Sequence, residues 1–106
     1  MDITVQELKA KIDAGQTPLM IDVREPHEWD MDHLEGVRKI SLGILPVQLP
    51  GLDEFKDQEI VLICRSGARS ARATGLLHSH GFDGARNLVG GMLAWKTYID
   101  PGFNVQ

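Results

Sequence analysis

Hydrophobic positions along this 106-residue chain follow two spacings. In some stretches apolar side chains recur every three or four residues, which predicts amphipathic helices. Between these stretches stand short, continuous apolar runs, which predict strands that are buried on both faces of a sheet. Helices that alternate with such strands favour an α/β fold, in which a parallel sheet is covered by helices on both sides.

The apolar runs predict five short strands. The clearest is 60–63, which we expect at the centre of the sheet, and 19–23 is a second buried strand. Residues 2–4, 38–41 and 85–88 predict three further strands with weaker patterns, the first of them at an edge of the sheet.

Five helical segments are predicted around these strands. The first begins at a capping box, in which the side chains of Thr4 and Glu7 each bind the backbone N–H of the other residue. Its apolar face is formed by residues 5, 8 and 12, and Gly15 ends it. The other expected segments are residues 26–33, a short turn around Val47 and Leu49 in the loop 42–52, residues 70–80, and a final helix after Gly90 and Gly91 with Met92, Trp95 and Ile99 on its buried side.

The composition limits the class of protein and its partners but indicates no particular reaction. The chain is 42% hydrophobic and 25% charged, which is typical of soluble globular proteins, and its length suits a single domain over 1–106. A net charge of −4 argues against a nucleic-acid partner. No apolar run approaches the roughly 20 residues of a membrane span. Without a basic and apolar leader, and with one cysteine, we expect a cytoplasmic protein that needs no membrane and has no internal disulfide.

The only cysteine stands where the central strand meets the following helix. Residues 64–70 read Cys-Arg-Ser-Gly-Ala-Arg-Ser, directly after residue 63. Sites in open parallel sheets form at the carboxyl ends of strands. Successive backbone N–H groups in such a turn can form an anion cradle, and the helix dipole favours negative charge there. We therefore expect Cys64 to be an exposed, catalytic thiolate nucleophile.

We expect the rest of this loop to bind the substrate. Gly67 allows the backbone to curl, and arginine guanidinium groups suit an oxyanion. Arg72 is either a further cation at the loop or a solvated charge of the helix. The expected substrate-binding residues are Arg65, Ser66, Gly67, Ala68, Arg69 and Ser70.

The residues after the second strand are expected to support the loop rather than to act on substrate. Asp22 and Arg24 are the candidate supporting residues. Arg69 either binds substrate or braces the loop through an acidic residue, and Asp22 and Glu25 are the candidate partners because neighbouring strands would bring them close. No Cys and His residues have the spacing of metal ligands, so we expect no metal. Trp29, Trp95 and the methionines are expected in the core.

Four segments together resemble a known family. Residues 64–70 look like the active loop of single-domain rhodaneses, which are sulfurtransferases. Residues 21–29 are similar to the first signature of the family, 33–37 to the segment after it, and 90–95 to its closing Gly-Gly-x-x-Ala-Trp motif. The motifs occur in family order over nearly the whole chain. One departure is Asp32, because the family usually has glycine there.

The resemblance implies a three-layer α/β/α fold with a five-stranded parallel sheet in the order 3-2-4-5-1. It also implies a ping-pong reaction without a metal or organic cofactor. The Cys64 thiolate would attack the outer sulfur of a small anionic donor such as thiosulfate, and sulfite would leave a persulfide. Because the chain has no second cysteine, the acceptor is external: cyanide, a thiol, a thioredoxin-like dithiol or a sulfur-delivery protein.

Three other functions remain open. A persulfide sulfur carrier, fed by a partner protein, would use the same Cys64. Phosphatases and arsenate reductases of similar fold have a loop one residue longer, whereas four residues separate Cys64 from Arg69 in this chain. A non-enzymatic interaction module is disfavoured because rhodanese-like domains with that role lack the cysteine.

Overall fold

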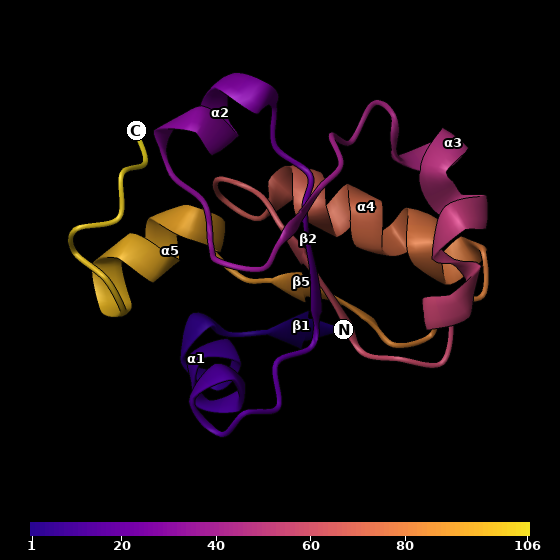
Figure 1. Cartoon of the computed structure of the whole chain (residues 1–106), viewed down its shortest axis with the longest axis horizontal. Helices are drawn as coiled ribbons and strands as arrows, with labels where there is room; N and C mark the ends of the chain where they lie inside the picture. The colour runs from indigo at the N-terminus through magenta and orange to yellow at the C-terminus, as the bar shows by residue number, and fades with distance from the viewer.

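The apolar runs form one parallel sheet in the computed structural model, which describes all 106 residues (Figure 1). The strands lie in the order β1-β5-β4-β2-β3, so the implied order 3-2-4-5-1 is confirmed. The two strands at the edges have two residues each, and the other three have four. Their bounds are β1 (Asp2–Ile3), β2 (Leu19–Asp22), β3 (Arg38–Lys39), β4 (Ile60–Ile63) and β5 (Ala85–Leu88).

Helices cover both faces of this sheet, as the alternating pattern predicts (Figure 1). The capping box at the start of the first helix is present, with Glu7 N donating to Thr4 Oγ1 over 3.1 Å. None of the helices is long and apolar enough to cross a membrane. The helices are α1 (Val5–Asp13), α2 (Pro26–Met31), α3 (Leu45–Gln48), α4 (Ala68–Ser79) and α5 (Gly91–Tyr98), with the 3-10 helix η1 (Leu49–Phe55) after α3.

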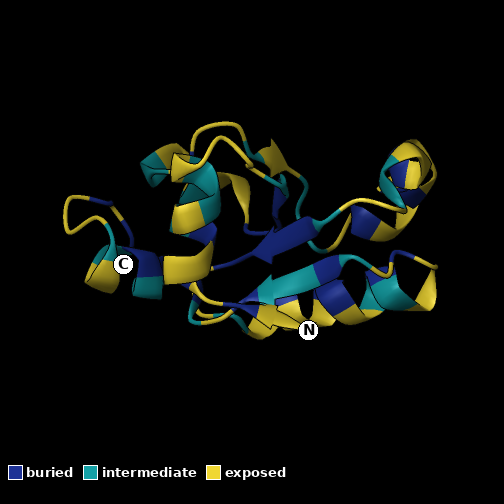
Figure 2. Cartoon of the chain, turned by 90° about the horizontal axis from the view of Figure 1, so that it is seen from below, coloured by how far each residue is buried: buried dark blue, intermediate teal, exposed yellow.

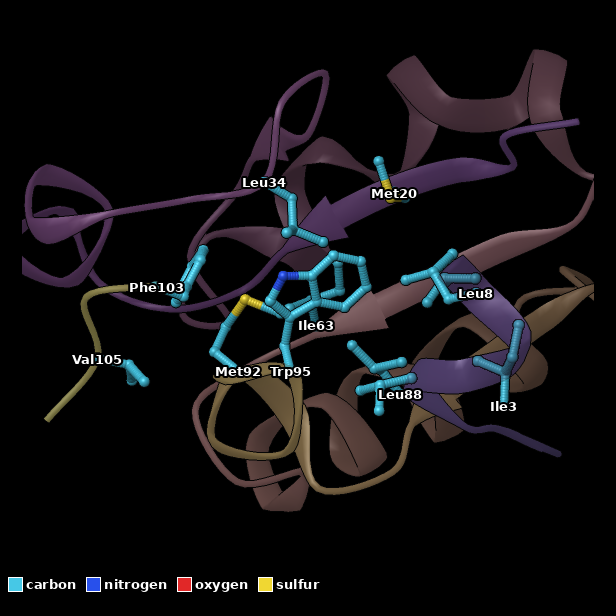
Figure 3. Close-up of a cluster of buried hydrophobic side chains, with 12 residues drawn as sticks. Ile3, Leu8, Met20, Leu34, Ile63, Leu88, Met92, Trp95, Phe103 and Val105 are labelled. Atoms are coloured by element: carbon cyan, nitrogen blue, oxygen red, sulfur yellow. The ribbon is translucent and has the colours of Figure 1, made fainter. Parts of the chain in front are cut away.

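The central strand β4 contributes to two separate cores because successive side chains of a strand point to opposite faces. Val61 and Ile63 pack with α1 and α5, and Ile60 and Leu62 pack with α3, η1 and α4. Figure 3 shows the first core, where Trp95 lies between the sheet and α5. Each fully buried side chain of this size contributes about 1.5–3 kcal/mol. Figure 2 shows the resulting arrangement, with buried residues on the sheet and exposed ones on the outer helix surfaces.

Several predicted bounds differ from the structure for local reasons. The second helix ends at Met31 rather than at residue 33, because Asp32 has extended backbone angles. Helix α4 begins at Ala68 rather than at residue 70, because Gly67, with a φ of 105°, turns the chain directly into the helix. The stretch 42–52 contains more helix than one turn, since α3 continues into η1.

The expected core residues are confirmed only in part. Trp95, Met20 and Met92 are buried. Trp29 and Met31 are half-buried, so the prediction for them was wrong. Both lie on α2, which has no fully buried residue, because this short helix lies at the end of the sheet rather than across its face. Met1 is exposed, since only its backbone joins the sheet, through β5.

Candidate active site

Cys64 lies at the carboxyl end of β4, immediately before the turn into α4. Gly67 holds this turn with left-handed backbone angles, which a residue with a Cβ adopts only at a cost. The turn brings the Gly67 N–H to 3.0 Å from Cys64 Sγ. The N–H groups at the start of a helix have no partner within the helix, and that of Gly67, the residue before α4, donates to the sulfur. The positive end of the α4 dipole therefore faces the thiol.

The sulfur is not exposed, contrary to the expectation from the sequence. Cys64 is 1% exposed, because the loop folds back and places Gly67 N–H and the Ser70 hydroxyl around the sulfur. Burial by itself disfavours a charged group. Hydrogen bonds gain strength in a site that excludes water. The contacts of the sulfur thus decide how well the loop holds a negative charge.

Ser70 faces the sulfur and not an open surface. Its Oγ lies 3.2 Å from Cys64 Sγ and donates to Asn87 Oδ1 over 2.5 Å, and the residue is fully buried. Asn87 comes from β5 and was not among the site residues predicted from the sequence. The signal was available: Asn87 is a polar residue two positions after the buried Ala85, on the strand face that packs against α4.

The start of α5, which contains the closing Gly-Gly motif, is hydrogen-bonded to the backbone of the Cys64 loop. Met92 N donates to the carbonyl of Cys64 over 2.9 Å, and Leu93 N donates to that of Arg65 over 3.0 Å. These bonds need a very close approach, because a Cβ on Gly91 would lie 2.3 Å from the Cys64 oxygen. The carbonyls of the loop are thereby turned toward α5. Of the N–H groups in the loop, that of Gly67 donates to the sulfur.

Arg69 forms a bidentate ion pair with Glu28, not with Asp22 or Glu25, so the expected partners were wrong. The two bonds measure 2.7 Å and 2.9 Å. Glu28 is placed there by α2, where its side chain also accepts from Glu25 N over 3.0 Å. The hydrogen bonds from Arg69 lower the pKa of Glu28 to about 2, and Glu28 in turn raises the pKa of Arg69. Arg69 is thus held in place beside the loop.

Asp22 and Arg24 form a fully buried ion pair at the end of β2. Arg24 Nε lies 3.0 Å from Asp22 Oδ1, and Arg24 Nη2 also donates to the carbonyl of Asp32 over 2.8 Å. Asp32 itself has extended backbone that any residue adopts, and its carboxylate accepts from Asn104 N. The pair therefore ties β2 to the segment after α2, and its side chains make no hydrogen bond to residues 64–70.

The remaining loop residues form an exposed rim. Ser66 and Ala68 are exposed at the tip, and Arg65 is exposed with its Nε donating to the carbonyl of Gln106. Arg72 is exposed and has no ion-pair partner. A groove of about 570 Å³ runs beside the loop; its lining comprises Glu25, Leu42, Gly43, Pro46, Arg69, Arg72 and Leu76.

Two histidines have structural partners in backbone carbonyl groups. His33 Nδ1 lies 3.1 Å from the carbonyl of Trp29, and His78 Nε2 lies 2.7 Å from that of Ala85. No group of three or more His, Cys, Asp or Glu side chains is arranged to hold a metal ion. The sulfur of Cys64 accepts from the Gly67 N–H and lies beside the Ser70 hydroxyl.

Comparison with known proteins agrees with this arrangement. The family model of the rhodanese-like domain matches residues 4–98. A probable adenylyltransferase/sulfurtransferase, MoeZ of Mycobacterium tuberculosis, is 37% identical over 93% of this chain, and a putative sulfurtransferase, YtwF of Bacillus subtilis, is 38% identical over 94% of both chains. The chain spans about a quarter of the length of the first curated relatives it matches.

Solved structures give the same result. The crystal structure of a rhodanese-like domain protein from Staphylococcus aureus superimposes with a TM-score of 0.81 and 31% identity, covering 100% of this chain and 99% of that one. By its sequence motifs, its strand order and its match over residues 4–98, the chain belongs to the family of rhodanese-like domains.

Proposed function

We propose that this protein moves sulfane sulfur from a small anionic donor such as thiosulfate to an external thiol or to cyanide, through a persulfide on Cys64. One observation carries the proposal: the Gly67 N–H points at Cys64 Sγ from 3.0 Å, at the start of α4. A donor aimed at sulfur stabilises the anion that must form there, whether thiolate or persulfide. A reducing cytoplasm keeps a lone thiol free, so we place the reaction in that compartment.

The reaction has two displacement steps. In the first, the Cys64 thiolate attacks the outer sulfur of thiosulfate, a new S–S bond forms, and the old one breaks with its electron pair leaving on sulfite. In the second, the acceptor attacks the outer sulfur, and the electron pair of that S–S bond returns to Cys64. No oxidant or reductant is needed, because sulfur is passed between nucleophiles. The negative charge stays within the loop throughout.

The cations of the loop have different roles in this proposal. Arg69 is engaged by Glu28 and supplies fixed positive charge, while the backbone of Ser66, Gly67 and Ala68 surrounds the incoming sulfur. Arg65 in the loop and Arg72 on α4 are both exposed and attract the donor. Their charge raises the local concentration of small anions in a chain whose net charge is −4.

The direct test is the intact mass of the reduced protein before and after thiosulfate, followed by cyanide. We expect a gain of one sulfur atom, removed by cyanide as thiocyanate, and no gain in Cys64→Ser. Ser79→Ala is the matched control, because it changes a hydroxyl at the far end of α4. Wild-type protein that gains no sulfur, or a Cys64→Ser variant that gains it equally, would contradict the mechanism.

A persulfide sulfur carrier is the second candidate. A putative sulfur carrier protein, YrkF of Bacillus subtilis, is 35% identical over 89% of this chain, which covers 50% of that protein. Both roles use the same Cys64 persulfide, so they are distinguished by the rate at which different donors transfer sulfur to Cys64, here called loading. Loading that is much faster from a persulfide-bearing protein than from thiosulfate would favour the carrier. Equal or faster loading from thiosulfate would favour the enzyme.

A further inference from the structure

Two side chains connect the sulfur to the neighbouring strand. Cys64 Sγ lies 3.2 Å from Ser70 Oγ, and Ser70 Oγ lies 2.5 Å from Asn87 Oδ1. Ser70 is fully buried on α4, and Asn87 is half-buried on β5, where it pairs with Leu62 in the sheet register. The last member of this chain of contacts therefore stands on the rigid sheet and not on the loop.

A serine hydroxyl has only one proton to give. In the arrangement described above, that proton goes to Asn87 Oδ1, so toward the sulfur the Ser70 oxygen can only accept. This suits the thiol, whose S–H donates. After ionisation the sulfur needs a donor, and the hydroxyl must turn toward it. Asn87 Oδ1 then loses its partner.

An amide resolves this conflict because it carries a donor and an acceptor at nearly the same position. Rotation of the Asn87 amide places Nδ2 where Oδ1 was, so that Nδ2 donates to Ser70 Oγ while Ser70 donates to the anion. Asn87 makes no other side-chain hydrogen bond, so the rotation breaks only its bond to Ser70. The amide also lies against the loop: Nδ2 is 3.9 Å from the position of a Cβ on Gly67.

We propose that Asn87 is a positioning residue which, through Ser70, allows one hydroxyl to serve both the neutral thiol and the anionic forms of Cys64. Its role in turnover rests on the proposed function, and its effect on the thiolate does not. Carboxylate or apolar groups at this position would fail for different reasons. A carboxylate would keep the Ser70 proton and add negative charge, and an apolar side chain would leave the hydroxyl without orientation.

No charged side chain takes the place of this contact. The hydrogen-bond partners of the sulfur are the Gly67 N–H and the Ser70 hydroxyl, both uncharged. Most charged or titratable groups on the elements around Cys64 have other partners: Arg69 binds Glu28, Arg24 binds Asp22, Arg86 binds Glu59, Lys96 binds the carbonyl of Phe103, Arg65 binds that of Gln106, and His78 pairs with that of Ala85. Arg72 has no partner, but it lies on the exposed side of α4 and makes no hydrogen bond to the sulfur.

The test measures the rate at which iodoacetamide alkylates Cys64 as a function of pH. Asn87→Leu and Ser70→Ala should each slow alkylation about tenfold below the midpoint of the pH profile, and move that midpoint up by about one pH unit, the worth of one hydrogen bond to a charged group. Asn87→Asp should slow it further. In the Ser70→Ala background, Asn87→Leu should add less than about a twofold change, because the two residues act as one unit.

Thermal unfolding of each variant shows whether it is folded. If Asn87→Leu does not fold, Asn87→Asp serves as the test variant, because it retains the shape of the asparagine side chain. Ser79→Ala, the matched loss of a hydroxyl on α4, should keep the wild-type profile. A folded Asn87 variant with the wild-type profile, or Asn87→Leu acting equally strongly without Ser70, overturns the proposal. If wild-type protein takes no sulfur from thiosulfate, the proposed function fails, and the alkylation profiles still decide the role of Asn87.

Discussion

Two turns at the carboxyl ends of neighbouring strands, one after β4 and one after β5, have the same backbone arrangement. Each follows a strand of the parallel sheet and leads directly into a helix. Each turn has a glycine with left-handed angles at the helix start, Gly67 with φ 105° and Gly90 with φ 76°. Neither helix has a side chain that caps its first N–H groups. Without such caps, these N–H groups need partners from elsewhere.

The two turns differ in where these N–H groups are directed. In α5, the N–H groups of Met92 and Leu93 bind the carbonyls of Cys64 and Arg65. In the turn after β4, the N–H of Gly67 meets a sulfur atom. One turn is thus satisfied by the protein itself, and the other is satisfied by the group that would carry the negative charge. The comparison shows that the second glycine turn is the support of the first.

The largest effect is expected where the supporting turn meets the loop. In Gly91→Ala the new Cβ would lie 2.3 Å from the Cys64 oxygen and 2.6 Å from that of Arg65. Because backbone cannot yield cheaply, we expect a loss of about 3 kcal/mol in the free energy of unfolding and a loss of about a hundredfold in sulfur transfer. Urea unfolding and thiocyanate formation measure the two effects.

Gly75→Ala is the control for this variant, because a Cβ there meets nothing within 4 Å and lies inside α4. It should be neutral or raise stability by up to about 1 kcal/mol. Equal behaviour of the two variants would mean that the turn after β5 does not support the loop.

A smaller effect is expected in the turn that holds the sulfur. Gly67→Ala forces a residue with a Cβ to a φ of 105°, which costs about 1–2 kcal/mol, and its Cβ would lie 3.3 Å from Gly90 N. Since the Gly67 N–H would shift from the sulfur, sulfur transfer should fall about tenfold. Gly51→Ala, at an open position without left-handed angles, is the control. Wild-type turnover in Gly67→Ala would show that this N–H is dispensable.

The smallest effect concerns the ion pair that holds Arg69. The folded-state pKa of Glu28 is lowered from an ordinary 4.5 to about 2, so its contribution to stability is complete above pH 4.5 and disappears as the pH falls through about 2. Glu28→Gln should therefore cost about 1 kcal/mol near neutral pH, since the pair is partly solvated. The difference in the free energy of unfolding between wild-type protein and Glu28→Gln, here called the gap, should therefore disappear as the pH falls toward 2. Urea unfolding over this pH range measures it, with the exposed Glu54→Gln as control; a gap that is constant with pH would contradict the prediction.

Much of the fold could be predicted from local patterns. The apolar run 60–63 is the central strand, the capping box of Thr4 and Glu7 is present, and the sheet has the implied strand order. The strand and the capping box depend on side-chain spacing or on residues three positions apart, which a sequence displays directly. The strand order was implied by the resemblance to the family. Errors occurred mainly at the ends of elements, as at Asp32, where single backbone angles end a helix.

The candidate site was predictable in composition but not in its contacts. The motif at 64–70 placed Cys64 after β4 and identified the arginines. It did not show that Glu28 rather than Asp22 or Glu25 binds Arg69, because three acidic residues lie within the same short stretch. Choosing between them requires the position of α2 above the sheet edge.

The sequence by itself determined most of the strands and helices and the family, and it predicted Cys64 as the residue with the reactive sulfur. Only the tertiary structure decided that this sulfur is buried, that Asn87 reaches it through Ser70, and that α5 holds the carbonyls of the loop. The reason is physical. A parallel sheet brings the carboxyl ends of strands that are distant in sequence to one edge, and the partners that meet there share no local pattern.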